Sequence, residues 1–209
     1  MQYKLILLDV DGTLYSHTTK SIPESTIKAL KMVQEKGIKI GIASGRSKIV
    51  TAFTGILDIL DFDFFVTTNG NLVIDKFDNV IYSNPMNQKG IDMVLDLVDK
   101  YELNATFMTL DDFYIYRDID KRAHLGFDPL SIPLPYKKEY KRENIYQINL
   151  FCEDEFIPYF EETKEYLQYS RLAHYGYDIY TKDHSKATGI EKLCEYLKIS
   201  KDECIAFGD

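Results

Sequence analysis

Cysteine and positive charge are both scarce in this sequence. The three cysteines, Cys152, Cys194 and Cys204, are odd in number, far apart and in no metal-ligand spacing. They argue against a disulfide framework and favour free thiols in a reducing compartment. Lys and Arg number 25 against 33 Asp and Glu, which gives a net charge of −8. A general nucleic-acid-binding surface needs clustered Lys and Arg, so we expect no nucleic-acid partner.

Long apolar runs are also missing. No run approaches the roughly 18 residues that a membrane span needs. Only four apolar residues follow Lys4 before Asp9, which is not the pattern of a signal peptide. We therefore expect a soluble, cytoplasmic protein with no membrane partner. The length of 209 residues suits one large domain or a core domain with an inserted second one.

The most informative stretch is Asp9-Val10-Asp11-Gly12-Thr13-Leu14, directly after the apolar residues 5–8. Such a short apolar run predicts a strand that is buried on both faces of a parallel sheet. Open α/β sheets bind ligands just beyond the carboxyl ends of their strands, where these two carboxylates would lie. Gly12 and Thr13 would bend the chain and leave backbone N–H groups free to face an anion. The stretch predicts a phosphoryl-transfer centre.

Strands and helices alternate through the first 82 residues. We expect strands over residues 5–8, 38–43 and 64–67, followed by a hairpin of residues 72–74 and 80–82. Ser21 would cap the first helix, with Glu24 at the capping-box position and Gly37 at its end. Apolar residues at helical spacing predict a second helix over residues 50–60. This order predicts an α/β fold built on a doubly wound parallel sheet, which is a Rossmann-like architecture.

Residues 83–182 break the alternation and predict an inserted α+β domain. We expect a helix over residues 91–101, strands over 105–110 and 113–116, an irregular proline-containing stretch, a strand over 145–152, a helix over 155–169, and strands over 172–175 and 178–181. The parallel-sheet pattern then returns with a helix through Ile190, Leu193 and Leu197 and a strand over 204–207. Residues 1–82 and 183–209 would form the core domain. A chain rarely ends at the tip of a buried strand, so we expect that this core domain is truncated at Asp209.

Polar groups end several of these elements: Asp9 and Asp11, Ser44, Lys186 and Asp209. If these ends converge, the carboxylates suit Mg²⁺, which favours one or two protein carboxylates together with phosphate oxygens. The cation would let Asp9 approach a phosphate dianion. Lys186 and the Ser44 hydroxyl would hold the other phosphoryl oxygens, and Asp11 could act as general acid and base.

Each of these residues also has a plainer interpretation. Asp9 and Asp11 could lie in a solvated turn; a calcium loop is excluded because no further acidic ligands follow at the required spacing. Ser44 could be a helix N-cap, a role that is compatible with phosphate binding. Lys186 could be a surface lysine, and Asn69 could be either a turn residue or a substrate contact. Three further expectations are that Arg46 lies at the surface in a first helical turn, that the four histidines have no ligand spacing, and that the tyrosines of the insert serve packing.

Taken together, these segments resemble the haloacid dehalogenase (HAD) superfamily. Asp-Val-Asp-Gly-Thr-Leu is similar to its first motif, Ala43-Ser44-Gly45-Arg46 to the second, Lys186-Ala187-Thr188-Gly189 to the third, and Gly208-Asp209 to the start of the fourth. The resemblance implies that Asp9 forms an aspartyl-phosphate, that Asp11 is the acid/base, and that Asp209 completes a Mg²⁺ site with Asp9 and Asp11. The phosphate-binding residues would be Gly12, Thr13, Ser44, Gly45 and Lys186.

The insert resembles the type IIB cap of the Cof-like sugar-phosphate phosphatases, and Thr67-Thr68-Asn69-Gly70 is similar to the same subgroup. The resemblance implies a Mg²⁺-dependent phosphatase of small phosphorylated metabolites, above all sugar phosphates. The second acidic residue of the fourth motif, and the strand and helix after it, do not occur in this sequence. A phosphomutase of the same superfamily and a catalytically silent binding or regulatory member are the alternatives.

The charge of the insert limits how it could recognise a substrate. Residues 83–182 hold 12 Lys and Arg against 18 Asp and Glu, a net charge of −6. An acidic insert does not attract anions over long range, so local cations would have to contact the leaving group. The candidates are Arg117, Lys121, Arg122 and the cluster at residues 137–142.

Overall fold

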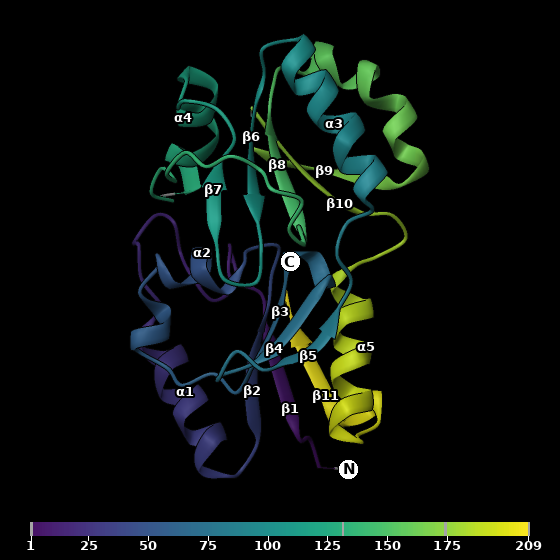
Figure 1. The fold of residues 1–209 in the computed structure, drawn as a ribbon. Helices are drawn as coiled ribbons and strands as arrows, with labels where there is room; N and C mark the ends of the chain where they lie inside the picture. Colours follow the sequence, from purple (N-terminus) through teal and green to yellow (C-terminus); the bar gives the residue numbers. More distant parts are fainter. Residues whose placement is uncertain (1, 131, 174, 209) are drawn as a thin grey trace. The chain divides into compact units, whose positions relative to one another are not determined.

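The computed structural model describes residues 2–130, 132–173 and 175–208. Residue contacts divide the chain into two units (Figure 1). The first unit, called the core unit below, contains the residues up to Ser83 and those from Ser185 onward. The inserted unit runs from Asn84 to His184. The boundaries from the sequence pattern lie within two residues of these positions.

The core unit is built on a six-stranded sheet with the order β11-β1-β2-β3-β4-β5. Strands β11, β1, β2 and β3 are parallel, and β4 and β5 extend the sheet as an antiparallel hairpin. β1 is buried along its whole length because strands flank it on both edges and its four residues are all apolar. The strands span Leu5–Leu8 (β1), Lys39–Ala43 (β2), Phe64–Thr67 (β3), Leu72–Asp75 (β4), Val80–Ser83 (β5) and Cys204–Phe207 (β11).

Helices cover both faces of this sheet, as the sequence pattern predicted. In Figure 1, α1 (Glu24–Glu35) and α2 (Lys48–Ala52) lie on one side of the sheet and α5 (Lys186–Leu197) lies on the other. Apolar residues of β1, β3 and α5 share one core cluster, which includes Leu7, Val66 and Leu193. The α/β fold class with a parallel-rich sheet is therefore confirmed.

Two details of these helices differ from the predictions. Pro23 stands at the N-cap position of α1 with no side-chain cap, and the Ser21 hydroxyl donates to the Thr19 hydroxyl instead. The prediction of a capping box from Ser21 was wrong because the helix begins three residues later. The predicted helix over residues 50–60 is broken: Gly55 adopts φ of +73°, and a short 3₁₀ turn, Ile56–Asp58 (η1), follows it. A left-handed residue cannot continue an α-helix.

The inserted unit has its own five-stranded antiparallel sheet with the order β7-β6-β8-β10-β9. Its core lies between this sheet, α3 and a long 3₁₀ segment (η4), and it includes Val94, Phe107 and Phe160. In Figure 1, α3 lies on one side of the sheet and α4 on the other. The elements span Gln88–Lys100 (α3), Asn104–Met108 (β6), Phe113–Ile115 (β7), Lys121–Phe127 (α4), Asp128–Leu130 (η3), Gln147–Phe151 (β8), Asp154–Glu165 (η4), Leu167–Ala173 (β9) and Gly176–Thr181 (β10).

Here too the sequence pattern misjudged two segments. The helix predicted over residues 155–169 is a 3₁₀ segment that ends at Glu165, and β9 begins at Leu167. Pro158 lies inside this segment and lacks the N–H that an α-helix would use. The stretch expected to be irregular contains α4, which begins where the Asp120 carboxylate accepts the N–H of Ala123. Among the described residues, no helix is both long enough and apolar enough to span a membrane.

Candidate active site

The carboxyl ends of β1, β2 and β11 lie next to one another at one edge of the core-unit sheet. Leu8 is in register with Ile42 on one side and with Phe207 on the other. The Asp9 N–H donates to the Phe207 carbonyl at 2.9 Å, which extends the pairing one residue beyond β1. Asp9 and Ser44 therefore leave neighbouring strands at the same edge, where open α/β sheets bind their ligands.

A tight turn follows β1 and fixes the direction of the two aspartates. The N–H of Leu14 donates to the carbonyls of Asp9 and Val10, at 3.2 and 3.1 Å. Gly12 has φ of +75°, a conformation that favours glycine. Its N–H donates to the Tyr15 carbonyl at 3.2 Å, so the prediction that this N–H is free to face an anion was wrong. The Thr13 N–H makes no backbone hydrogen bond with another described residue.

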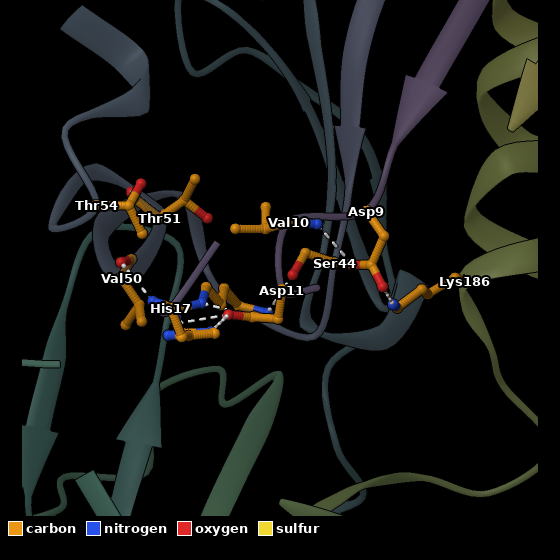
Figure 2. Close-up of polar contacts among 10 residues, drawn as sticks. Asp9, Val10, Asp11, His17, Ser44, Val50, Thr51, Thr54 and Lys186 are labelled. Carbon is orange, nitrogen blue, oxygen red and sulfur yellow. Dashed lines mark hydrogen bonds and ion pairs between the residues drawn. The ribbon is translucent and has the colours of Figure 1, made fainter. Parts of the chain in front are cut away.

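Asp9 is held between its own turn and the first residue of α5. Its Oδ1 accepts the N–H of Val10 at 2.8 Å, and its Oδ2 lies 2.8 Å from Nζ of Lys186 (Figure 2). The Asp9 side chain is 14% exposed and that of Lys186 is 37% exposed. Lys186 comes from a segment 177 residues further along the chain, so the parallel fold is what brings this pair together.

Asp11 has a different set of partners, and both are cations or potential cations. Nε and Nη2 of Arg46 donate to its two carboxylate oxygens, each at 2.8 Å. Nε2 of His17 lies 2.6 Å from Oδ1 of the same carboxylate. Figure 2 shows the Asp11 carboxylate turned toward His17, while the Asp9 carboxylate is turned toward Lys186. Burial alone would raise the pKa of Asp11, but the hydrogen bonds and charge of Arg46, with those of His17, lower it below its ordinary value.

Ser44 and Asn69 follow the ends of β2 and β3 and are joined by a backbone hydrogen bond. Ser44 is 1% exposed, and its Oγ accepts the N–H of Arg46 at 3.2 Å. The carbonyl of Ser44 accepts the N–H of Asn69 at 3.3 Å. Asn69 lies in a 3₁₀ turn, Thr68–Gly70 (η2), with φ of +55°. Ser47, three residues beyond Ser44, is the residue that caps α2, so Ser44 is not that helix's N-cap. Gly45 lies in the bend between Ser44 and Arg46.

The predicted site residues are thus only partly in direct contact. Asp9 contacts Lys186, whereas Asp11 contacts two residues, Arg46 and His17, that were not among the predicted site residues. Arg46 was expected at the surface and is only 5% exposed, so that expectation was wrong. Its burial follows from the pairing of its guanidinium with Asp11, because an unpaired buried cation would be costly. The histidines showed no metal-ligand spacing in the sequence. The position of His17, six residues after Asp11, is the one sequence feature that could have indicated its contact with Asp11.

The carboxylates supply hard oxygen donors of the kind that Mg²⁺ takes. No group of three or more His, Cys, Asp or Glu side chains that could hold a metal ion occurs within residues 2–130, 132–173 and 175–208. Asp209, the third predicted ligand, lies outside the described residues. Mg²⁺ typically uses one or two protein carboxylates and completes its shell with water and phosphate, so the donors at the end of β1 fit this ion.

The inserted unit carries a surface depression of about 390 Å³ at the end of its β6–β7 hairpin. Among the residues that line it are Thr109, Asp111, Lys138 and Lys141. Most of the cations proposed for leaving-group recognition are in ion pairs: Arg117 with Asp99, Arg122 with Glu153, Lys137 with Asp118, Lys138 with Asp112, and Arg142 with Asp92. Lys141 has no ion pair with another described residue.

Comparisons with known proteins agree with this geometry. The family model for haloacid dehalogenase-like hydrolases matches residues 6–209. YkrA of Bacillus subtilis strain 168, which carries a provisional phosphatase name, is 34% identical over 219 residues; the match covers 100% of this chain and 80% of YkrA. Phosphoglycolate phosphatase 1 of Saccharolobus solfataricus is 28% identical over 209 residues, with 99% of this chain and 75% of that protein covered.

Solved structures share the fold over nearly the whole chain. A hypothetical protein of Geobacillus kaustophilus superposes with a TM-score of 0.87 at 28% identity, covering 99% of this chain and 80% of its own. The sugar phosphatase BT4131, of HAD subclass IIB, has a TM-score of 0.83 at 24% identity with the same coverage, a likeness that concerns the fold alone. The resemblance identified in the sequence is therefore confirmed: the chain belongs to the haloacid dehalogenase-like hydrolases and is a phosphatase of that family.

Proposed function

We propose that this protein is a Mg²⁺-dependent phosphatase of small phosphorylated metabolites, above all sugar phosphates, and that it works through an aspartyl-phosphate on Asp9. The observation that carries the proposal is that two carboxylates at the end of one buried strand have separate cationic partners, Lys186 for Asp9 and Arg46 for Asp11. A single ion pair could be structural. Two independently held carboxylates, two residues apart at a ligand-binding sheet edge, suit one nucleophile and one proton carrier.

In the first step, Asp9 forms a bond to phosphorus while the bond from phosphorus to the leaving oxygen breaks. Lys186 is placed to balance negative charge on the phosphoryl oxygens as well as on Asp9. A leaving alkoxide is a poor leaving group unless it gains a proton, and Asp11 would donate that proton. Arg46 and His17 lower the pKa of Asp11, and the negative charge of a bound phosphate beside this carboxyl group would raise that pKa and favour the protonated form.

In the second step, water attacks the aspartyl-phosphate. Asp11, left ionised by the first step, takes the proton from the attacking water, and Asp9 is released as a carboxylate. The same residue therefore serves as acid and then as base, which returns the enzyme to its starting protonation state after one turnover.

A bound Mg²⁺ would neutralise phosphate charge and so reduce the repulsion between the phosphate and Asp9. Asp9 and Asp11 would hold it, together with Asp209, in keeping with the oxygen donors that this ion prefers. Removal of divalent ions with a chelator should then abolish phosphate release, and added Mg²⁺ should restore it.

The substrate class is proposed from relatives and from the inserted unit. Phosphoglycolate phosphatase 1, which is 28% identical to this chain, is named for a small phosphorylated metabolite. The inserted unit, which we propose acts as a cap, would supply leaving-group contacts. Lys141 is our candidate among its cations, because it lines the depression and has no ion pair with another described residue.

The test is phosphate release from a panel of sugar phosphates, phosphoglycolate, glycerol phosphate and p-nitrophenyl phosphate, with Mg²⁺. Asp9→Asn keeps the shape of the side chain and removes the nucleophile, so we expect a loss of about 10⁴-fold or more in kcat. The matched control is Asp58→Asn, an exposed aspartate of η1, which should keep full activity. Undiminished turnover by purified Asp9→Asn would show that the proposed mechanism is wrong.

A further inference from the structure

The ion pair of Arg46 with Asp11 has two hydrogen bonds, whereas that of Lys186 with Asp9 has one. Two separate nitrogens of the guanidinium donate to the two oxygens of the carboxylate, each at 2.8 Å. This two-bond geometry fixes the plane of the carboxylate as well as its distance. A single ammonium group, such as that of Lys186 on Asp9, fixes only one oxygen.

Arg46 is itself held firmly, so it can transmit a position to Asp11. Its side chain is 6% exposed. Nη1 lies 3.5 Å from the Val50 carbonyl in α2, and the backbone N–H of Arg46 donates to Ser44 Oγ. The guanidinium is therefore anchored by the first turns after β2, on a different element from the one that carries Asp11.

His17 contacts the same carboxylate from the loop after the turn. Its Nε2 lies 2.6 Å from Asp11 Oδ1, and its ring packs edge-on against Tyr15, with the ring centroids 5.3 Å apart. Both oxygens of Asp11 are thus engaged, and Figure 2 shows this carboxylate near His17 and away from Lys186. Neither Arg46 nor His17 is among the partners that the structure gives for Asp9.

We propose that Arg46 is a positioning residue for Asp11: its bidentate contact sets the orientation from which Asp11 carries protons, and it does not serve as a phosphate ligand. His17 supports the same orientation through a single contact. The inference rests on the proposed function, because an orientation of Asp11 matters only if Asp11 transfers protons. Under this proposal Arg46 affects the reaction only through Asp11, and a double-mutant cycle can detect this dependence.

The experiment compares Arg46→Met, Asp11→Asn and the double variant with the wild type, all as the full chain with Mg²⁺. The two probes are p-nitrophenyl phosphate and the sugar phosphate that the wild type hydrolyses fastest. Both probes carry the same phosphoryl group. The p-nitrophenolate group leaves without gaining a proton, whereas a sugar alkoxide needs a proton in order to leave. With the sugar phosphate we expect Arg46→Met to lower kcat/KM about 10- to 100-fold, part of the usual contribution of a general acid.

Two further results are expected if Arg46 acts through Asp11. The loss of kcat/KM with p-nitrophenyl phosphate should be several-fold smaller than the loss with the sugar phosphate. In the Asp11→Asn background, adding Arg46→Met should change kcat/KM by no more than about 2-fold, because the residue to be positioned has lost its proton-transfer group. Arg46→Lys, which keeps the charge but not the two-bond fork, should recover only part of the rate.

Equal losses with both probes, or additive losses in the double variant, would overturn the proposal in favour of a phosphate-binding or merely structural role. The matched control is Lys48→Met, which removes a cation two residues away that contacts Asp78 and the Lys76 carbonyl. If circular dichroism shows that Arg46→Met does not fold, Arg46→Lys takes its place in the comparison of the two substrates. Failure of the wild type on every substrate, with no difference from Asp9→Asn, would refute the proposed function instead.

Discussion

The side chains of Asp9 and Asp11, which are separated by one residue, have different hydrogen-bond partners. Asp9 accepts from its neighbour's N–H and from Lys186, whereas Asp11 is bound on both oxygens by Arg46 and on one by His17. Alternation along an extended chain would place the two side chains on the same side. The turn that closes at Leu14 and Tyr15 separates their directions instead.

A second network of single residues determines how the inserted unit responds to acid. The Tyr114 hydroxyl donates to Glu143 at 2.6 Å, and Lys138 bridges Glu143 and Asp112 at 3.6 and 2.7 Å. Burial by itself would raise the pKa of both carboxyl groups. Hydrogen bonds from Lys138 and Tyr136 to Asp112, and from Tyr114 to Glu143, lower both pKa values below the ordinary ones. Burial and the Glu143 contact raise the pKa of Tyr114.

These shifts predict an acid-dependent loss of stability. A carboxyl group with a lowered pKa in the folded state stabilises that state above its unfolded pKa, which is about 4. The stabilisation disappears as pH falls through the lower, folded-state pKa. The combined variant Asp112→Asn, Glu143→Gln should therefore be less stable than the wild type at pH 7, by on the order of 1 kcal/mol, with a much smaller difference near pH 2.5.

Urea unfolding at both pH values measures this difference. The exposed residue Glu139 provides the control: Glu139→Gln should leave the urea midpoint unchanged at either pH. A stability gap that is the same at pH 7 and at pH 2.5 would contradict the assignment.

At the scale of elements, the start of α5 approaches η2 so closely that glycine is required on both sides. A Cβ at Gly189 would lie 2.6 Å from Val66 Cγ1 and 2.8 Å from the Gly70 Cα. At Gly70, where φ is +88°, a Cβ would lie 2.1 Å from the Ser185 carbonyl oxygen. This contact positions the first turn of α5, and with it Lys186, against the end of β3.

Gly189→Ala should therefore destabilise the protein, although alanine is the better helix former. The overlap with a strand side chain and with backbone should cost about 1–3 kcal/mol, and the gain in helix propensity of up to about 1 kcal/mol offsets only part of it. Displacement of α5 should also lower phosphatase activity, because it moves Lys186 away from Asp9. Urea unfolding and kcat measure the two effects.

Gly55→Ala is the matched control for that change. Gly55 has φ of +73°, but a Cβ there would meet no atom within 4 Å. It should cost only the backbone strain of about 1 kcal/mol and leave kcat unchanged. If Gly189→Ala were as stable and as active as the wild type, the close packing of α5 on η2 would not be what positions Lys186.

At the scale of the whole molecule, the inserted unit has a hydrophobic core cluster that shares no residue with the cluster of the core unit. The inserted unit forms its own five-stranded sheet, and the buried residues of its core cluster lie between Met86 and Ile179. The core unit is interrupted in sequence, and its last parallel strand, β11, pairs with the first, β1. The two ends of the chain are thus needed together to complete one sheet.

This division predicts that residues 84–184 fold when expressed alone. A sheet with all its pairings internal and a buried core of its own should give a cooperative urea transition and dispersed amide signals in NMR spectra. The same fragment with Ala105→Asp, which places a charge at a fully buried position of β6, should not fold. A fragment without a cooperative transition would mean that the inserted unit depends on the core unit for its structure.

Local patterns in the sequence were enough to predict most elements. The apolar runs of β1, β2 and β3 and the return to a helix and a strand after residue 183 were predicted and are confirmed. These features depend on a few consecutive residues, which is why they can be read without the fold. The errors at Ser21, Gly55 and Leu167 arose where a turn or a strand pairing overrode the local preference.

The sequence by itself determined the family to which the chain belongs, because the first motif keeps its residues within one short stretch. Only the tertiary structure decided which cation serves which carboxylate. Arg46 lies 35 residues from Asp11, and Lys186 lies 177 residues from Asp9. Those pairs depend on the register of β1 with β2 and on the approach of α5 to η2, and neither is encoded by the spacing of any nearby residues.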